Sequence, residues 1–302
     1  MIASMRVVLA FLLAVFVSGT TPLAIQWSEH GLGLFFTVSV RMTLGLMICL
    51  TLIWILRIPM LRHDQALRAY LVGGLGFFCG ITCSYWGLQL IPSGWSSVLF
   101  GLSPMFNGFI ARRLLAEPFG WNRVCGSLLG LAGLGLVFFQ GIRVDFANNG
   151  LGVGIMVVAV VIFSLTTVTM KRIGHQIHPL AITTGSLMVM TPCFFISWYG
   201  TQGILPTTIP PRTLGAILYL ASFSTVIGFV SMYYLLSRVD ASVAALPNLL
   251  APLFGVWLGV VLNGEQVQPV FLAGAFLVLL GLSIFQWGGC LWKKRVGGVD
   301  SR

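Results

Sequence analysis

Residues 104–117 read PMFNGFIARRLLAE, and residues 252–265 read PLFGVWLGVVLNGE. The two stretches lie 148 residues apart, and in each a proline is followed thirteen residues later by a glutamate. Both residue types are scarce in this chain, so their shared spacing is a stronger signal than matches of leucine or glycine. The same offset aligns further pairs, which include Gly80 with Gly228, Tyr85 with Tyr233, Gly126 with Gly274, and Gly133 with Gly281. The sequence therefore predicts two similar halves.

The composition indicates that both halves are embedded in a membrane. Of the 302 residues, 57% are hydrophobic and 8% are charged, and the mean hydropathy is +0.97. A soluble domain carries about 25% charged residues, so a soluble fold could not cover this much apolar surface. A closed β-barrel would need alternating apolar segments of about ten residues, and the sequence lacks them. We therefore expect an all-α, polytopic membrane protein.

Apolar stretches separated by short polar breaks predict ten transmembrane helices, five in each half. They cover residues 6–26, 34–56, 69–90, 95–113, 122–140, 151–170, 180–199, 213–236, 241–262 and 268–289. The predicted repeats are residues 1–141 and 150–290, followed by a basic tail at 291–302. Because five is odd, the second repeat must enter the membrane upside down relative to the first. Inverted repeats of this kind are typical of secondary transporters.

The positions of the basic residues predict the orientation of the chain. If the N-terminus is cytoplasmic, fourteen of the 17 Lys and Arg residues fall on the cytoplasmic side, as the positive-inside rule requires. Only Arg143 and Arg212 fall outside, and Arg41 falls within a span. We expect a multi-pass protein of the plasma membrane, which is the inner membrane in a bacterium, with both termini cytoplasmic. The formal charge of +10 then lies at helix ends, which argues against a nucleic acid partner.

Residues 85–139 and 233–285 each contain a helix with a mid-span proline and a terminal glutamate, followed by a closing helix with spaced glycines. In this arrangement they resemble the EamA domain of the drug/metabolite transporter superfamily. The resemblance covers nearly the whole chain. It implies ten helices around a central cavity, with alternating access for amino acids, nucleotide-related compounds, amphiphilic drugs or other metabolites, often outward. Phe16 stands where many relatives have Trp, so we do not transfer substrate contacts from the family.

Arg41 is the charge expected inside the hydrocarbon, toward the outer end of the span at 34–56. A charge near the bilayer centre costs about 2.5–3.5 kcal/mol on insertion scales, so such a residue usually faces a partner or a watery cavity. The functional interpretation is a counter-charge for an anionic substrate group such as a carboxylate. The structural alternative is that the side chain reaches the outer interface or bonds helix carbonyls.

Polar and aromatic side chains near mid-span are further candidates for the cavity, because they suit hydrogen bonding and stacking. With Arg41, the candidate substrate-binding residues are Thr21, Tyr85, Trp86, Ser103, Asn107, Thr167, Ser224, Tyr233, Asn248 and Trp257. Ser and Thr in membrane helices often bond the backbone or a neighbouring helix instead. Pro104 and Pro252 each remove a backbone donor, which predicts paired hinges, with static packing as the alternative. Glu117 and Glu265 favour helix capping over proton coupling.

Other function classes lack their signatures in this sequence. The motifs G-x-S-x-G and H-E-x-x-H and the phosphate-binding G-x-x-x-x-G-K-[ST] are missing, which disfavours an intramembrane enzyme or an ATP-driven pump. Cys79 and Cys83 are four residues apart without a nearby His, so we expect no metal and no cofactor. We expect a secondary transporter, working as an exporter of a small metabolite in the lipid bilayer, with a channel or receptor as the alternative. The substrate, a coupling proton or ion, and a homodimer stay open.

Overall fold

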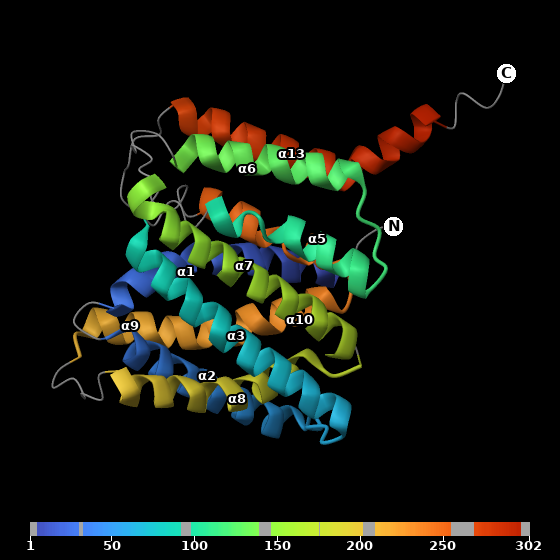
Figure 1. Ribbon diagram of the computed structural model, residues 1–302. Coiled ribbons are helices and arrows are strands. Elements are labelled where there is room, and N and C mark those ends of the chain that lie inside the picture. Colours follow the sequence, from blue (N-terminus) through green and yellow to red (C-terminus); the bar gives the residue numbers. More distant parts are fainter. Residues whose placement is uncertain are drawn as a thin grey trace. The chain divides into compact units, whose positions relative to one another are not determined.

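The computed structural model describes residues 5–29, 33–91, 98–138, 146–174, 176–201, 209–254 and 269–296. Within these ranges every regular element is a helix, which confirms the all-α prediction (Figure 1). The chain divides into two compact units. Unit 1 consists of Met1–Thr82 and Leu165–Val239, and unit 2 of Cys83–Ser164 and Asp240–Arg302. Each unit takes helices from both halves of the sequence, so the predicted repeats interleave in three dimensions and are not separate lobes.

Unit 1 is built around two packed helices and a long composite helix. It contains α1 (Met5–Glu29), α2 (Leu34–Leu56), the first part of α3 (Asp64–Leu90), the last part of α7 (Phe146–Gly174), α8 (Pro179–Thr201), α9 (Pro211–Tyr219), η1 (Leu220–Gly228) and α10 (Phe229–Leu236). The elements α9, η1 and α10 follow one another without a break, and η1 has π-helical hydrogen bonding. The helix α2 packs against α8, and α1 packs along the composite helix.

Unit 2 contains the remaining parts of α3 and α7 and a closely packed pair of long helices. Its other elements are α5 (Ser103–Leu114), α6 (Trp121–Phe138), α11 (Ala241–Ala244), a helical stretch at 247–254, and α13 (Pro269–Val296). The helices α6 and α13 lie side by side (Figure 1). The four-residue glycine spacing in this region is typical of such close helix packing.

Glycines set the contact between α6 and α13. A Cβ placed on Gly126 would lie 2.5 Å from the carbonyl oxygen of Gly281, and one on Gly133 would lie 2.6 Å from that of Gly274. The residue numbers rise along α6 as they fall along α13, so the two helices are antiparallel. At the 148-residue offset Gly126 aligns with Gly274 and Gly133 with Gly281. Exchanging the two halves of the sequence therefore converts the contact between Gly126 and Gly281 into the contact between Gly274 and Gly133.

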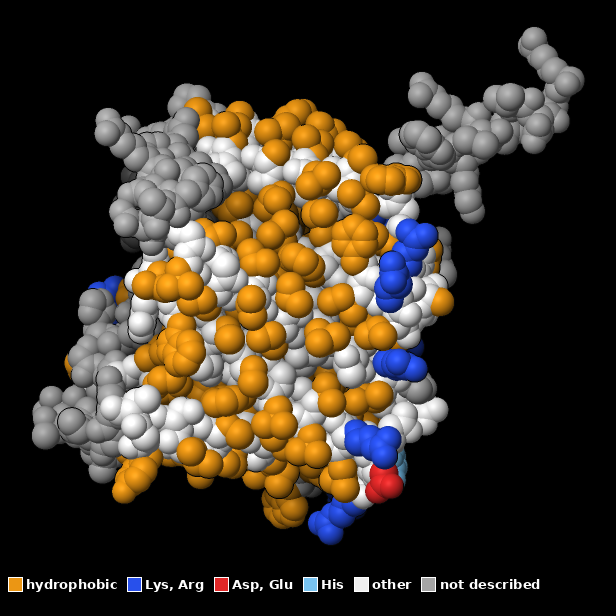
Figure 2. Space-filling view, viewed as in Figure 1, with side chains coloured by type: hydrophobic (Ala, Val, Ile, Leu, Met, Phe, Trp, Pro, Cys, Tyr) orange, Lys and Arg blue, Asp and Glu red, His pale blue; other side chains and the backbone are white. Residues whose placement is uncertain are grey.

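Five helices are long and apolar enough to cross a membrane within the described residues. They are Leu34–Leu56, Asp64–Leu90, Gly150–Gly174, Pro179–Thr201 and Pro211–Leu236. Their outer faces carry large hydrophobic side chains, with Trp54, Ile196 and Tyr199 exposed by 80%, 73% and 81%. Figure 2 shows the same pattern on unit 1, where hydrophobic side chains cover the helices and basic ones gather where α2 ends and α3 begins. The total of ten transmembrane spans in the chain stays a prediction.

The helix bounds differ from the predicted spans mainly at polar ends. The span predicted at 34–56 coincides with α2, whereas α3 begins at Asp64 and not at residue 69. Hydropathy detects the apolar part of a helix, and the first turn of α3 is polar. The span predicted at 95–113 contains a non-helical turn at residues 101–102, immediately before α5.

Candidate functional site

The side chain of Arg41 lies inside unit 1, where it bonds two hydroxyl groups of η1. It is 9% exposed. Its Nε donates to Thr225 Oγ1 at 2.9 Å, and its Nη2 donates to Ser224 Oγ at 3.0 Å. The two hydroxyl acceptors are neutral, and the two bonds fix the orientation of the guanidinium.

The helix α1 adds a third hydroxyl to this group. Thr21 Oγ1 lies 3.0 Å from Ser224 Oγ and 2.6 Å from the carbonyl oxygen of Val17. One turn of α1 and one turn of η1 are thus joined to α2 through Ser224. We call Thr21, Arg41, Ser224 and Thr225 the Arg41 cluster. It unites three of the predicted candidates, from three helices, around one buried charge.

The backbone of α2 approaches η1 closely at Gly45, one turn after Arg41. A Cβ on Gly45 would lie 2.7 Å from Thr225 Cγ2 and 3.2 Å from Thr225 Cβ. Only glycine leaves room for this approach without moving Thr225. The π-helical turns of η1 present Ser224 and Thr225 side by side to Arg41, and π-helical turns occur frequently at functional sites.

The other candidates in unit 1 lie in its packed interior. Tyr233 is buried, with its hydroxyl 3.3 Å from Ser186 Oγ and its ring edge-on to Phe77 at 6.4 Å. Thr167 is also buried, on α7. Tyr233 therefore belongs to an aromatic core that joins α3, α8 and α10, and its role toward a substrate stays a prediction.

In unit 2, Asn107 and Glu117 both bond the first residue of α11. Asn107 Nδ2 donates to the carbonyl oxygen of Ala241 at 3.2 Å, and Glu117 Oε2 accepts from the Ala241 amide at 2.8 Å. Asn107 is 3% exposed, and its Oδ1 is buried without a hydrogen bond in the described part of the chain. Glu117 therefore caps α11, which lies in the other half of the sequence.

An ion pair lies beside this cap. Arg123 Nη2 lies 2.6 Å from Asp240 Oδ2, with exposed side-chain fractions of 19% and 32%. Arg123 Nη1 also donates to Ser242 Oγ at 3.0 Å and to the Pro118 carbonyl oxygen at 2.8 Å. These bonds tie the start of α6 to the start of α11, which suits a structural role at a helix end.

The remaining candidates are spread over unit 2. Ser103 Oγ donates to the Phe100 carbonyl oxygen at 2.6 Å, which serves the local start of α5. Pro104 also stands at this start, after the turn at 101–102, while Pro252 lies within the helical stretch 247–254. Trp86 is 55% exposed, and Tyr85 and Asn248 are half-buried. Trp257 and Glu265 lie outside the described residues, and the paired hinge stays a prediction.

Sequence reasoning missed how the Arg41 cluster is assembled. Ser224 and Thr225 lie 183 and 184 residues from Arg41, so no local spacing relates them to it. The available signal was two adjacent hydroxyl residues within an apolar stretch. Over the described ranges, no group of three His, Cys, Asp or Glu side chains is arranged to hold a metal ion.

Comparison with known proteins shows that a family model matches this chain twice. A model described as the EamA-like transporter family matches residues 5–139 and again residues 150–286. A solved crystal structure, whose title names no function, shares the fold with a TM-score of 0.79 at 18% identity. That match covers 94% of this chain and 98% of the other.

Several similar proteins carry transporter names. A protein of Chlamydia trachomatis serovar L2 named as an S-adenosylmethionine/S-adenosylhomocysteine transporter is 26% identical over 292 residues, which cover 92% of this chain and 88% of that protein. A protein of Streptantibioticus cattleyicolor named "Probable terminal-alkyne amino-acid exporter" is 24% identical over 208 residues, 66% of each chain. A protein of Archaeoglobus fulgidus named as an uncharacterized transporter is 28% identical over 222 residues, 70% of this chain and 76% of the other.

Proposed function

Because the chain belongs to the EamA-like transporter family, we propose that this multi-pass membrane transporter exports a small metabolite that bears a carboxylate. The proposed route is alternating access between two inverted five-helix repeats. The substrate class rests on the Arg41 cluster, and the inverted arrangement rests on the contact between α6 and α13.

The packing of α6 on α13 supports inverted insertion of the repeats. The 148-residue offset makes α6 the fifth span of the first repeat and α13 the fifth span of the second. Equivalent helices of repeats inserted in the same direction would run parallel. Here they run antiparallel, and the contact of Gly126 with Gly281 is the exchanged copy of the contact of Gly133 with Gly274. This is the relation produced by a pseudo-two-fold axis in the membrane plane.

The Arg41 cluster supports an anionic group on the substrate. Placing an arginine within a span costs about 2.5–3.5 kcal/mol, so a purely structural position would favour a neutral side chain. Ser224 and Thr225 hold the guanidinium through two neutral acceptors, and its planar array of N–H donors matches a carboxylate. Two relatives are named for an amino acid and for S-adenosylmethionine, and both of these molecules carry a carboxylate.

Transport by the purified protein in liposomes tests this proposal. Counterflow would be measured for a panel of amino acids, each paired with its amide, which has the same side chain but no carboxylate. A hydrogen bond to a charged group contributes about 1.5–3 kcal/mol. We therefore expect Arg41→Gln to weaken the apparent affinity for the acids roughly 10- to 150-fold and to leave the amides unchanged. Arg62→Gln, an exposed loop position, is the matched control.

Two outcomes would overturn the proposal. Equal losses for acids and amides in Arg41→Gln would assign Arg41 a structural role and remove the argument for a carboxylate. A lack of saturable counterflow by the wild-type protein across a broad metabolite panel would count against a carrier of this class.

A further inference from the structure

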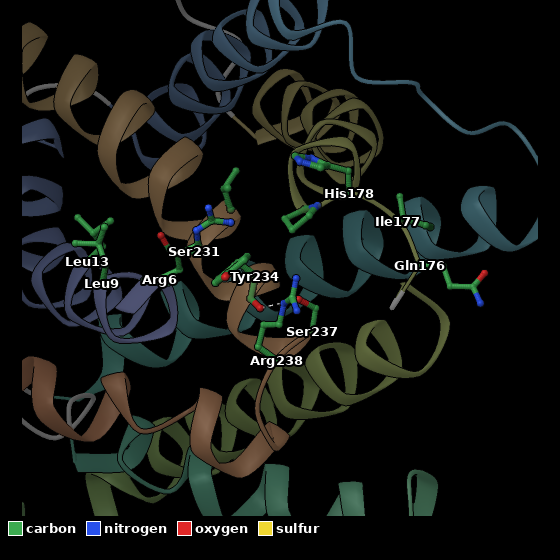
Figure 3. A pocket seen from close by; sticks show the side chains of 13 residues that line it. Arg6, Leu9, Leu13, Gln176, Ile177, His178, Ser231, Tyr234, Ser237 and Arg238 are labelled. Atoms are coloured by element: carbon green, nitrogen blue, oxygen red, sulfur yellow. Dashed lines mark hydrogen bonds between the residues drawn. The ribbon is translucent and has the colours of Figure 1, made fainter. Parts of the chain in front are cut away.

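A groove opens at one end of unit 1, away from the Arg41 cluster. It is lined by the start of α1, the end of α10, and the residues that lead into α8 (Figure 3). Its volume is about 760 Å³, within the range of about 300–1,000 Å³ that is usual for small-molecule sites. Pro179 is the first residue of α8, and Arg238 follows the last residue of α10 by two positions. Because both helices belong to membrane-length segments, we expect the groove at the level where lipid headgroups begin.

Cationic and donor groups form the rim of this groove. Arg6 and Arg238 both line it and are exposed, and among its described lining residues there is no Asp or Glu. The guanidinium of Arg238 lies 5.7 Å from the centre of the Tyr234 ring, a cation–π contact that holds it at the rim. Two arginines within one groove give it a strong preference for anions.

The start of α8 adds to this preference. His178 Nδ1 accepts from the Leu180 amide at 3.3 Å, so the neutral ring carries its proton on Nε2 and presents a donor. The N-terminal end of α8 also contributes the positive end of the helix dipole. Figure 3 shows His178 on the side of the groove opposite Leu9 and Leu13.

The deeper wall of the groove is apolar. Leu9 and Leu13 follow Arg6 along α1 and are 58% and 37% exposed. At about 1.5 Å per residue, the wall extends roughly 10 Å from Arg6 to Leu13. On α10, Ser231 and Tyr234, whose side chains carry hydroxyl groups, also line the groove. The groove therefore has basic residues at its mouth, hydroxyl-bearing residues on α10, and apolar residues along α1.

We propose that this groove is a binding site for the phosphate and glycerol portion of an anionic phospholipid, with Arg6 and Arg238 contacting the phosphate. The acyl chains would follow the apolar wall at Leu9 and Leu13. Basic pockets between membrane helices bind anionic lipid headgroups in this way. A soluble anion would use the arginines and gain nothing from the exposed leucines, so the apolar wall favours a lipid. This inference does not depend on the transported substrate.

Lipid binding to the full-length protein in detergent tests the proposal. Native mass spectrometry would titrate phosphatidylglycerol, with phosphatidylcholine as the neutral lipid and glycerol 3-phosphate as the soluble phosphate. Each basic residue near an anionic surface contributes about 1 kcal/mol, which is about fivefold in affinity, so Arg6→Gln/Arg238→Gln should weaken phosphatidylglycerol binding roughly 30-fold. Arg62→Gln/Arg172→Gln removes the same charge at exposed positions outside the groove and should leave binding within about twofold of wild type.

Each alternative result is decisive. Equal weakening by the two double variants would reduce the effect to overall charge and overturn the site. Binding of glycerol 3-phosphate as tight as that of phosphatidylglycerol would make it a soluble-anion site and overturn the lipid. Arg6→Lys/Arg238→Lys, which retains both charges, should recover most of the affinity. If it binds as weakly as the glutamine variant while melting at a lower temperature, the loss is structural and the proposal is wrong.

Discussion

Replacing Gly126 by alanine should separate α6 from α13 and destabilise the protein. The added methyl group would lie 2.5 Å from the Gly281 carbonyl oxygen, 2.6 Å from the Phe285 amide nitrogen and 2.8 Å from Phe285 Cβ. An ordinary contact begins at 3.4 Å, so the helices must move apart by about 0.9 Å. The nearest atoms are backbone, which cannot rotate away. Overpacking costs about 1–3 kcal/mol, and rigid neighbours place this substitution near the upper value.

The melting temperature in detergent, followed by tryptophan fluorescence, measures this cost. A loss of about 3 kcal/mol corresponds to roughly 6–12 °C on the scale of soluble domains of 150–250 residues. Gly154→Ala is the matched control, because a Cβ on Gly154 meets nothing within 4 Å. Alanine there should be neutral or stabilising by up to about 1 kcal/mol through helix propensity. Gly133→Ala, which disturbs the exchanged contact with Gly274, should behave like Gly126→Ala.

Equal melting temperatures for the Gly126 and Gly154 variants would refute this reasoning. Such a result would mean that α6 and α13 are not packed backbone to backbone, and the argument for inverted repeats would lose its structural support.

Two further substitutions test contacts within the separate units. Gly45→Ala places a methyl group 2.7 Å from Thr225 Cγ2 and should displace Thr225, which holds Arg41. In the counterflow assay, the apparent affinity for carboxylate substrates should fall about tenfold, and the affinity for the amides should not change. Glu117→Ala removes the acceptor of the Ala241 amide and should cost about 0.5–2 kcal/mol of stability in a melting experiment, whereas Glu117→Gln keeps an acceptor and should cost less. An unchanged melting temperature with loss of proton-dependent transport would instead assign Glu117 to coupling.

Hydropathy predicted most of the described helices because the membrane imposes one length and one polarity on each of them. The bounds of α2 were predicted to the residue, since Gly33 and Arg57 interrupt the apolar stretch at both ends. The turn before α5 was not predicted. Pro104 indicated a bend within a span, whereas a proline at the first positions of a helix is favourable and marks a start.

The site was predicted less completely than the fold. Arg41 was identifiable because a charge in an apolar span requires an explanation. Thr21 and Ser224 were also predicted as candidates, but the contact with Arg41 was not, because Ser224 and Thr225 meet it only through the packing of α2 on η1. π-helical turns also leave no clear pattern in a sequence. Arg6 and Arg238 were interpreted only as markers of orientation, since the groove that joins them forms from three helix ends distant in sequence.

Cysteine labelling at equivalent positions of the two repeats tests inverted insertion most directly. Arg62 and Pro210 are separated by 148 residues, and both are exposed. In a background without native cysteines, Pro210→Cys should react with a membrane-impermeant maleimide in intact cells, whereas Arg62→Cys should react only after permeabilisation. Labelling of both positions from the same side of the membrane would contradict the inverted repeats and the alternating access built on them.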